Sequence, residues 1–211
     1  MSRHRLFLLS LLAALVLAGC FTGERPTFAT QQIAAGTPTG DAAIDALLTR
    51  LDAAASTRPT FTAGYDLLTR FGNVERSATV VSEGRNRAVT IGSVRFVETG
   101  SGSTTCMAEV CTDGLRAQAI SDTQLTFSFY GADAAARLRV DARSKIGPTT
   151  SRAETIAGQS AACVDVLQAN NTAVYCVLES GVLARLDDAD VKITLTAYSP
   201  TADASEFSTA D

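Results

Sequence analysis

The sequence is poor in the residues on which much enzyme chemistry depends. It has no tryptophan, one histidine (His4) and two lysines (Lys145 and Lys192) in 211 residues. His4 lies in the N-terminal segment that we expect to be cleaved off (below), and a mature chain without histidine cannot form a Ser-His-Asp or Cys-His hydrolase or a histidine-ligated metal site. No serine stands three residues before either lysine, so the S-x-x-K acyl-enzyme motif is absent. We therefore expect a protein that is not an enzyme and has no cofactor.

Positive charge is also scarce. There are 18 Lys and Arg against 22 Asp and Glu, a net charge of −4, and no basic block. A nucleic-acid partner would require such a block, so we expect none. Asp187, Asp188 and Asp190 lack the glycine and distant glutamate of a calcium-binding loop, and we interpret them as a solvated turn. With 46% hydrophobic and 19% charged residues, the chain has the composition of one globular domain.

A long apolar run occurs only once. It extends from Leu6 to Leu17, is interrupted only by Ser10, and follows Arg3 and Arg5. A membrane-spanning helix needs about 20 apolar residues, whereas a run of about 12 is typical of the central region of a signal peptide. We therefore expect residues 1–19 to be a signal peptide, although an uncleaved anchor is the alternative.

The run ends in Leu17-Ala18-Gly19-Cys20, which resembles the lipobox of bacterial lipoproteins. The resemblance implies cleavage before Cys20, a diacylglycerol on its sulfur and acylation of the new amino group. Two or three acyl chains would anchor the protein firmly, whereas one would not. We expect an extracytoplasmic protein held on the bacterial cell membrane, or on the outer membrane where the envelope has two. The alternative is a secretory peptide with a chance cysteine.

Residues 20–40 are rich in Thr, Gly and Pro and are predicted to be a flexible tether, followed by one domain over 41–200. Its first element is an amphipathic helix from Asp41 that ends near Arg58-Pro59. The buried stripe of this helix is expected at four residues spaced i, i+3, i+4 and i+7, namely Ile44, Leu47, Leu48 and Leu51.

From Thr60 the hydrophobic period becomes two, with Phe61, Ala63, Tyr65, Leu67 and Phe71 predicted on one strand face. The fold class is predicted as α+β, with a mostly antiparallel sheet and a second helix inserted late. Further strands are expected at 77–83, 88–91, 94–97, 123–129, 162–167, 173–178, 182–186 and 191–198. The second helix is expected at 132–145, a flexible loop at 100–103 and a disordered tail at 201–211.

Four cysteines remain beyond Cys20, and outside the cytoplasm an even number favours disulfides. Cys106 and Cys111 would face each other if residues 108–109 form a hairpin tip. Cys163 and Cys176 would do so across a four-residue hairpin loop. We favour these local pairings over one that joins the first pair to the second. A zinc site would require closer spacing such as C-x2-C.

Several short motifs resemble the lipoproteins of the LolA and LppX/LprG type over residues 41–200. They are the Phe61-x-Ala-x-Tyr-x-Leu strand, Thr155-Ile-Ala-Gly-Gln, Ala162-Cys-Val, Tyr175-Cys and Gly181-Val-Leu. The resemblance implies a half-barrel sheet that wraps helices, with an apolar hollow for a lipid. The four cysteines depart from that family's pattern and leave open whether the sheet closes over a solid core.

Two functions follow. We predict a lipid-anchored carrier of a lipid or other apolar ligand. The alternative is a structural or interaction lipoprotein of the envelope with a filled core and a protein partner. The candidate cavity residues are Phe61, Tyr65, Leu67 and Phe71, for which ordinary core packing is the alternative. A carrier requires an apolar cavity of roughly several hundred Å³, whereas an interaction protein has a packed interior.

Overall fold

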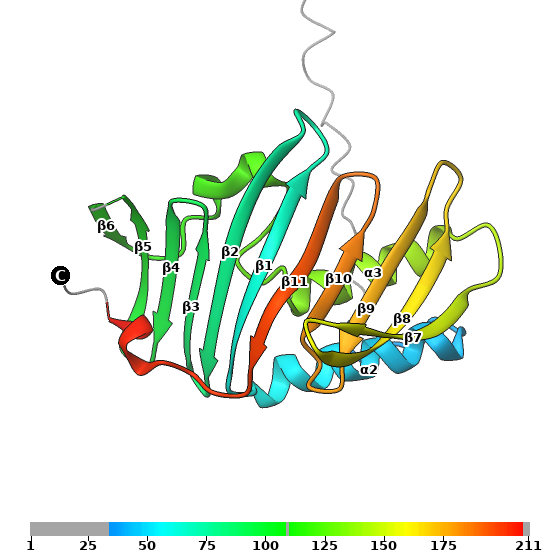
Figure 1. Ribbon diagram of the computed structural model, residues 1–211, viewed down its shortest axis with the longest axis horizontal. Helices are drawn as coiled ribbons and strands as arrows, with labels where there is room; N and C mark the ends of the chain where they lie inside the picture. The colour runs from blue at the N-terminus through cyan, green and yellow to red at the C-terminus, as the bar shows by residue number, and fades with distance from the viewer. Residues whose placement is uncertain (1–33, 109, 209–211) are drawn as a thin grey trace, which may run out of the picture. The chain divides into compact units, whose positions relative to one another are not determined.

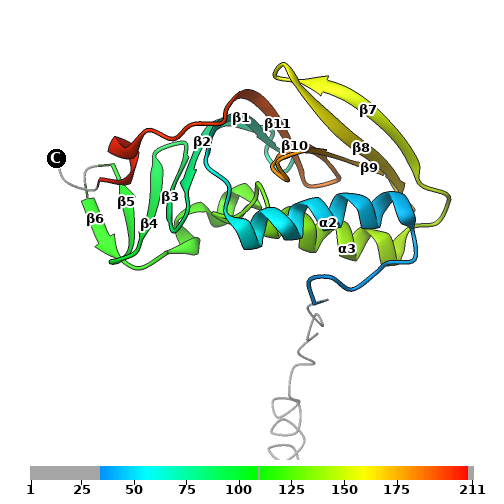
Figure 2. The same cartoon turned by 90° about the horizontal axis from the view of Figure 1, so that it is seen from below.

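A computed structural model describes residues 34–108 and 110–208. Within these residues, a curved, unclosed antiparallel sheet of eleven strands carries two α-helices on its concave side (Figures 1 and 2). This confirms the predicted α+β class and its antiparallel sheet. The strands are β1 (Phe61–Thr69), β2 (Val74–Glu83), β3 (Asn86–Ile91), β4 (Val94–Thr99), β5 (Gly102–Met107), β6 (Val110–Asp113), β7 (Thr150–Ile156), β8 (Gln159–Leu167), β9 (Thr172–Leu178), β10 (Leu183–Asp187) and β11 (Val191–Ser199).

The sheet consists of two meanders joined at one seam. Strands β1 to β6 pair with their neighbours in chain order, and so do β7 to β11. The seam is the antiparallel pair of β1 with β11, which aligns Thr69 with Val191 and Thr62 with Ser199. Figure 1 shows both meanders as one continuous surface.

Helix α2 (Ala42–Thr57) has the predicted bounds and buried stripe. The Asp41 carboxylate caps it by accepting hydrogen bonds from the backbone N–H groups of Ala43 and Ile44 at 3.1 and 3.3 Å. At the other end Arg58 has a φ of 50°, and its N–H donates to the Ala54 carbonyl at 2.8 Å. The buried side chains are Ile44, Leu47, Leu48 and Leu51.

Helix α3 (Ala132–Ser144) lies beside α2 under the second meander (Figure 2). Its buried face is made mostly of alanine, with Leu138 as the one large apolar side chain. Small side chains allow the two helices to approach closely. Arg139 is also buried and forms an ion pair with Asp52 of α2, which ties the helices together.

Residues 117–131 cover the concave side of the first meander, where a strand was expected over 123–129. That expectation is wrong: the 3-10 helix η1 (Ala117–Thr123) is followed by successive turns. The hydroxyls of Thr123 and Thr126 accept hydrogen bonds from the N–H groups of Leu125 and Ser128 at 3.2 and 3.1 Å. These bonds turn the backbone locally, in competition with a strand ladder.

The expected disorder of the C-terminal tail is also corrected for residues 201–208. The short 3-10 helix η2 (Ala204–Phe207) lies on the outer face of the first meander (Figure 2). There Ala202 and Phe207 pack on an apolar cluster of three buried residues, Val81, Ala88 and Val97. The tail is ordered because this outer patch would otherwise expose its apolar side chains to water.

Phe71 does not share the face of β1 as expected. The strand ends at Thr69, and Phe71 lies in the turn before β2 with 88% of its surface exposed. Asn73, with a φ of 51°, helps to reverse the chain there. The loop expected at 100–103 is shorter than predicted, since β5 begins at Gly102; β5, β6 and β7 were not predicted as strands.

The expected signal peptide and the lipidated Cys20 lie outside the described residues. The last residues of the expected tether contact the domain: Gly36 donates its N–H to Asp52 at 3.0 Å, and Thr39 donates its N–H to Asp45 at 2.7 Å. Among helices in the described part of the chain, none is both long and apolar enough to cross a membrane.

Candidate binding pocket

A pocket of about 130 Å³ opens where the end of α2 meets the β2–β3 turn and the beginning of α3. Residues from both meanders and both helices contribute to it. Its lining consists of Ala54, Ala55, Arg58, Pro59, Phe61, Ser82, Gly84, Arg85, Arg87, Glu98, Ser128, Tyr130, Gly131, Ala132, Gly181 and Val182.

Two glycines shape the walls of this pocket. Gly84 has a φ of 57°, which allows the two-residue turn between β2 and β3 that carries Arg85. Gly181 lies so close to α2 that a Cβ atom there would be 2.3 Å from the Arg50 carbonyl oxygen. The end of α2 can therefore meet the β9–β10 connection only where that connection has no side chain.

Arg87 forms the inner polar wall. It forms an ion pair with Glu98 and donates a hydrogen bond to the Tyr130 hydroxyl at 3.3 Å. Its guanidinium carbon also lies 5.0 Å from the ring centre of Phe127, a cation–π contact. Burial raises the pKa of Tyr130 above its usual value, so its hydroxyl stays protonated at neutral pH.

Two further arginines stand at the rim. Arg58 and Arg85 are exposed, and neither side chain has a hydrogen bond or ion pair with the described part of the chain. Below them Ser82 is 6% exposed and lines the pocket, where its hydroxyl is open to solvent. With Arg87 neutralised by Glu98, the pocket carries two unbalanced positive charges.

The floor of the pocket is apolar and aromatic. The Phe61 ring lies edge-on to Tyr130 at 5.8 Å and stacks with Tyr198 at 6.1 Å. Ala54 and Val182 complete this surface. The pocket therefore joins a positively charged rim to a small apolar base.

Of the four predicted cavity residues, only Phe61 lines the pocket. Tyr65 is buried in the core, where its hydroxyl donates to the Leu183 carbonyl at 3.0 Å. Leu67 also belongs to the core, and Phe71 is exposed in its turn. The structure thus does not bring the four together around one ligand site.

The concave side of the sheet is filled by side chains. One continuous buried cluster runs from α2 and α3 through both meanders, with Tyr65, Phe96 and Phe129 among its largest members. A more open hollow, of about 560 Å³, is lined by polar groups such as Asp66 and Lys192 and also by Leu67 and Leu68.

Both predicted disulfides are confirmed. Cys163–Cys176 links directly paired residues of β8 and β9, and its cysteines are only 1% and 0% exposed. Cys106–Cys111 links β5 with β6, and Cys111 is exposed. The local pairings form because each pair lies directly opposite across a hairpin, with a Cα–Cα distance of 4.0 Å.

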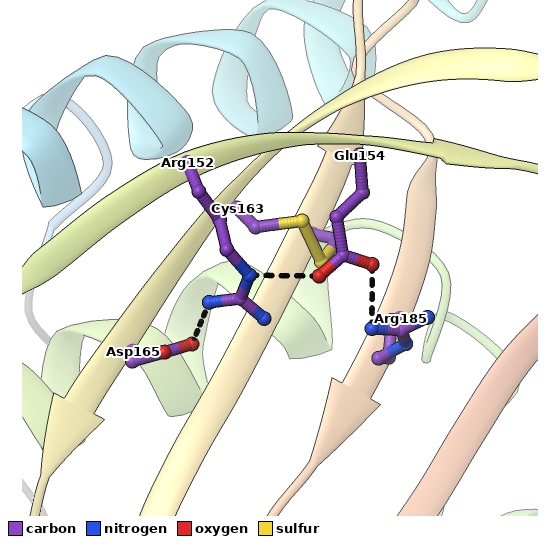
Figure 3. The surroundings of a disulfide bond; sticks show 6 residues. Arg152, Glu154, Cys163, Asp165 and Arg185 are labelled. Atoms are coloured by element: carbon purple, nitrogen blue, oxygen red, sulfur yellow. Dashed lines mark hydrogen bonds and ion pairs between the residues drawn. A yellow bond between two sulfur atoms is a disulfide. The ribbon is translucent and has the colours of Figure 1, made fainter.

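Strand β7 crosses over the buried disulfide and covers it with charged groups (Figure 3). Glu154 accepts hydrogen bonds from Arg152 and Arg185, each at 2.7 Å, and Arg152 also pairs with Asp165. The hydrogen bond from Arg152 lowers the pKa of Glu154, which keeps it ionised. Its carboxylate and the two sulfurs lie within 4.8 Å of one another, but the disulfide occupies both sulfurs, so they are not a metal centre.

The sequence interpretation missed the polar residues of the pocket, because they come from separate segments. One indication was present: Arg87 falls on the same strand face as Val89 and Ile91, and Glu98 on the same face as Phe96. A charge at an inward position marks a place where the core ends or a polar site begins.

Comparisons with known proteins give limited similarity. No family model and no curated protein matches the chain. Among solved structures, a crystal structure of MucB has a TM-score of 0.48 and 13% identity over 80% of this chain and 63% of that chain. The crystal structure of MucB in complex with MucA(peri) has a TM-score of 0.41 and 13% identity, over 77% of this chain and 60% of that chain. The Pseudomonas aeruginosa MucA/MucB complex has a TM-score of 0.41 and 11% identity, over 79% of this chain and 60% of that chain.

The chain thus spans about three fifths of those MucB chains. Similarity at this level identifies neither a family nor a function.

Proposed function

We propose that this chain is an extracytoplasmic, membrane-anchored interaction protein that presents a solid domain to a protein partner and does not carry a lipid inside its core. The observation that carries the proposal is the filled concave side, where helices, turns and sheet share one buried cluster. The pocket beside it has a volume of about 130 Å³. Small-molecule sites usually occupy roughly 300–1,000 Å³, so acyl chains would not fit in it.

The cysteines support the proposed compartment and the proposed anchor. Two disulfides use all four cysteines after Cys20, and structural disulfides persist in oxidising compartments outside the cytoplasm. The Leu17-Ala18-Gly19-Cys20 motif supports lipidation of Cys20, and the tether would then lead to the start of α2.

The pocket lies at the end of α2, beyond Thr57, whereas the chain enters this helix at Asp41. The preceding residues run back beside the helix, where Gly36 donates its N–H to Asp52 at 3.0 Å. Asp52 is less than one helical turn before Ala54 of the pocket lining, so a partner at the pocket would also lie near the tether.

Intact-mass analysis of protein extracted from the membranes of its own host tests the anchor. We expect loss of residues 1–19, added mass of two or three acyl chains, and the loss of four hydrogens for two disulfides. A Cys20→Ser variant is the control and should lack the acyl mass. An unmodified Cys20 in the native protein would refute the anchor.

Native and denaturing mass spectra of one preparation test the filled core. Covalent acyl chains remain in both spectra, whereas a carried lipid appears only in the native one. We expect the two masses to agree. A lipid bound in stoichiometric amount only in the native spectrum would favour the carrier function instead.

Photocrosslinking in the host tests the partner. A photoreactive residue in place of Arg85 at the pocket rim is compared with one in place of Lys192, an exposed position on β11. We expect a discrete protein adduct from the rim position only. No adduct at the rim, or the same adduct from both positions, would argue against a partner at the pocket.

A further inference from the structure

We propose that the pocket binds a phosphate monoester group, held by Arg58, Arg85 and the hydroxyl of Ser82. The group could belong to a soluble ester or to a lipid headgroup, since both present the same chemistry to the pocket. This goes beyond the proposed function, because a phosphate site can exist whether or not a protein partner docks beside it.

The charge of the pocket matches this ligand. Arg87 is paired with Glu98, whereas Arg58 and Arg85 have no side-chain partner in the described part of the chain, which leaves two positive charges. A phosphate monoester carries about −1.5 to −2 at neutral pH, and arginine binds phosphate oxygens through paired N–H groups. A single carboxylate would balance only half of this charge.

The donors also approach from several directions. Arg58 follows α2, Arg85 lies at the β2–β3 turn and Ser82 lies on the inner face of β2. Gly131 and Ala132, at the beginning of the 13-residue helix α3, form another wall, and the positive end of that helix favours an anion. The C-terminal end of α2 is the negative end of that helix's dipole and disfavours an anion. The positive charge of Arg58, which stands at this end, opposes that effect. A tetrahedral group with three terminal oxygens can accept from all these sides, whereas a planar carboxylate offers two oxygens.

Two residues of the pocket present side chains to a ligand. Ser82 lines the pocket, and its hydroxyl is open to the pocket's solvent, so it is free to donate to a ligand there. Arg58 occupies a left-handed position at a helix end, with a φ of 50°, where glycine is the usual residue.

Isothermal titration of the full-length, membrane-extracted protein in detergent with glycerol 3-phosphate tests the proposal. We expect saturable binding, with affinity at least tenfold higher than for glutarate, a dicarboxylate of similar charge. Arg58→Gly and Arg85→Ala should each weaken binding at least tenfold. Arg58→Gly also relieves the backbone, so its loss of binding cannot be attributed to unfolding.

The matched controls are Arg116→Ala and Arg143→Ala, two exposed arginines outside the pocket. Each should leave the affinity within twofold, and urea unfolding should show that every variant is folded. Absence of saturable binding, equal affinity for glutarate, or equal losses in the control variants would each overturn the proposal.

Displacement of glycerol 3-phosphate by lipid in mixed micelles distinguishes the two sources. Displacement by phosphatidate but not by phosphatidylglycerol supports a phosphate monoester on a lipid headgroup. Displacement by neither lipid supports a soluble ester. Equal displacement by both would overturn the monoester site, because it would show attraction to negative charge in general. The crosslinking and native mass spectra described above are independent of these results.

Discussion

Replacing Gly181 with alanine should separate α2 from the sheet at the pocket. Gly181 lies between β9 and β10 with a φ of 78°. A Cβ atom there would meet the Arg50 carbonyl oxygen at 2.3 Å and the Ala54 Cβ at 2.5 Å. Neither a backbone carbonyl nor a methyl group can rotate away, so the helix itself has to move.

Two separate terms contribute to the expected loss of stability. Alanine in a left-handed conformation costs about 1–2 kcal/mol, and overpacking of a filled site costs about 1–3 kcal/mol more. The free energy of unfolding should therefore fall by about 2–5 kcal/mol. Gly158 offers a matched control, because its φ is 73° but no atom lies within 4 Å of the position that a Cβ would take there. Gly158→Ala should show only the backbone term of about 1–2 kcal/mol.

Urea unfolding followed by far-UV circular dichroism, with both disulfides intact, measures the two variants. If the slope of the unfolding free energy against urea concentration is unchanged in both variants, the substitutions alter the stability of the folded state and not the compactness of the denatured state. Equal losses for Gly181→Ala and Gly158→Ala would refute the reasoning, because the contact with α2 would then have no energetic effect.

Three further predictions follow from other contacts. Burial raises the pKa of Asp41, but hydrogen bonds, the largest from Lys145, lower it to about 2 overall. The ionised carboxylate therefore stabilises the folded state above pH 4. This contribution is lost as the pH falls from about 4 to 2. After allowance for solvent screening, we expect this carboxylate to contribute about 1–2 kcal/mol to the free energy of unfolding. The Asp41→Asn variant keeps a capping oxygen, and its free energy of unfolding, measured in urea, should depend less on pH in this range than that of the unchanged protein. Mild reduction followed by alkylation and peptide mapping should label Cys106 and Cys111 first, because the other disulfide is buried under β7; simultaneous labelling would contradict this. Phe207→Ala should reduce the free energy of unfolding by about 1–2 kcal/mol, since the ring covers the outer apolar cluster; an unchanged urea midpoint would show that the tail contributes nothing.

Much of the fold could be predicted, namely wherever the period of the hydrophobic residues in a short segment determines its secondary structure. The stripe from Ile44 to Leu51 admits only a helix, and the alternation in Val191, Ile193 and Leu195 only a half-buried strand. The disulfides could be predicted because their pairing depends on short hairpins. Residues 123–129 were wrongly predicted as a strand because Leu125, Phe127 and Phe129 occupy alternate positions, as they would in a half-buried strand. Their conformation is decided by hydroxyl-to-backbone hydrogen bonds, which do not alter the hydrophobic pattern.

The pocket could not be predicted for a different reason. Arg58 lies at a helix end, Arg85 in a hairpin turn and Tyr130 before the second helix, and no local spacing relates them. They meet only because β1 and β2 place the first meander beside the end of α2. Such a site depends on the whole topology, whereas single elements depend on a few neighbouring residues.

The seam between β1 and β11 determines when folding can finish. Every other strand pair joins neighbours in the chain, but this one joins Thr62 to Ser199 and Thr69 to Val191. During synthesis the free edge of β1 has no native partner until β11 (Val191–Ser199) has emerged, and pairing across such a long loop is slow. Until then the exposed edge of β1 is the place where a chaperone, or another copy of the chain, would bind first.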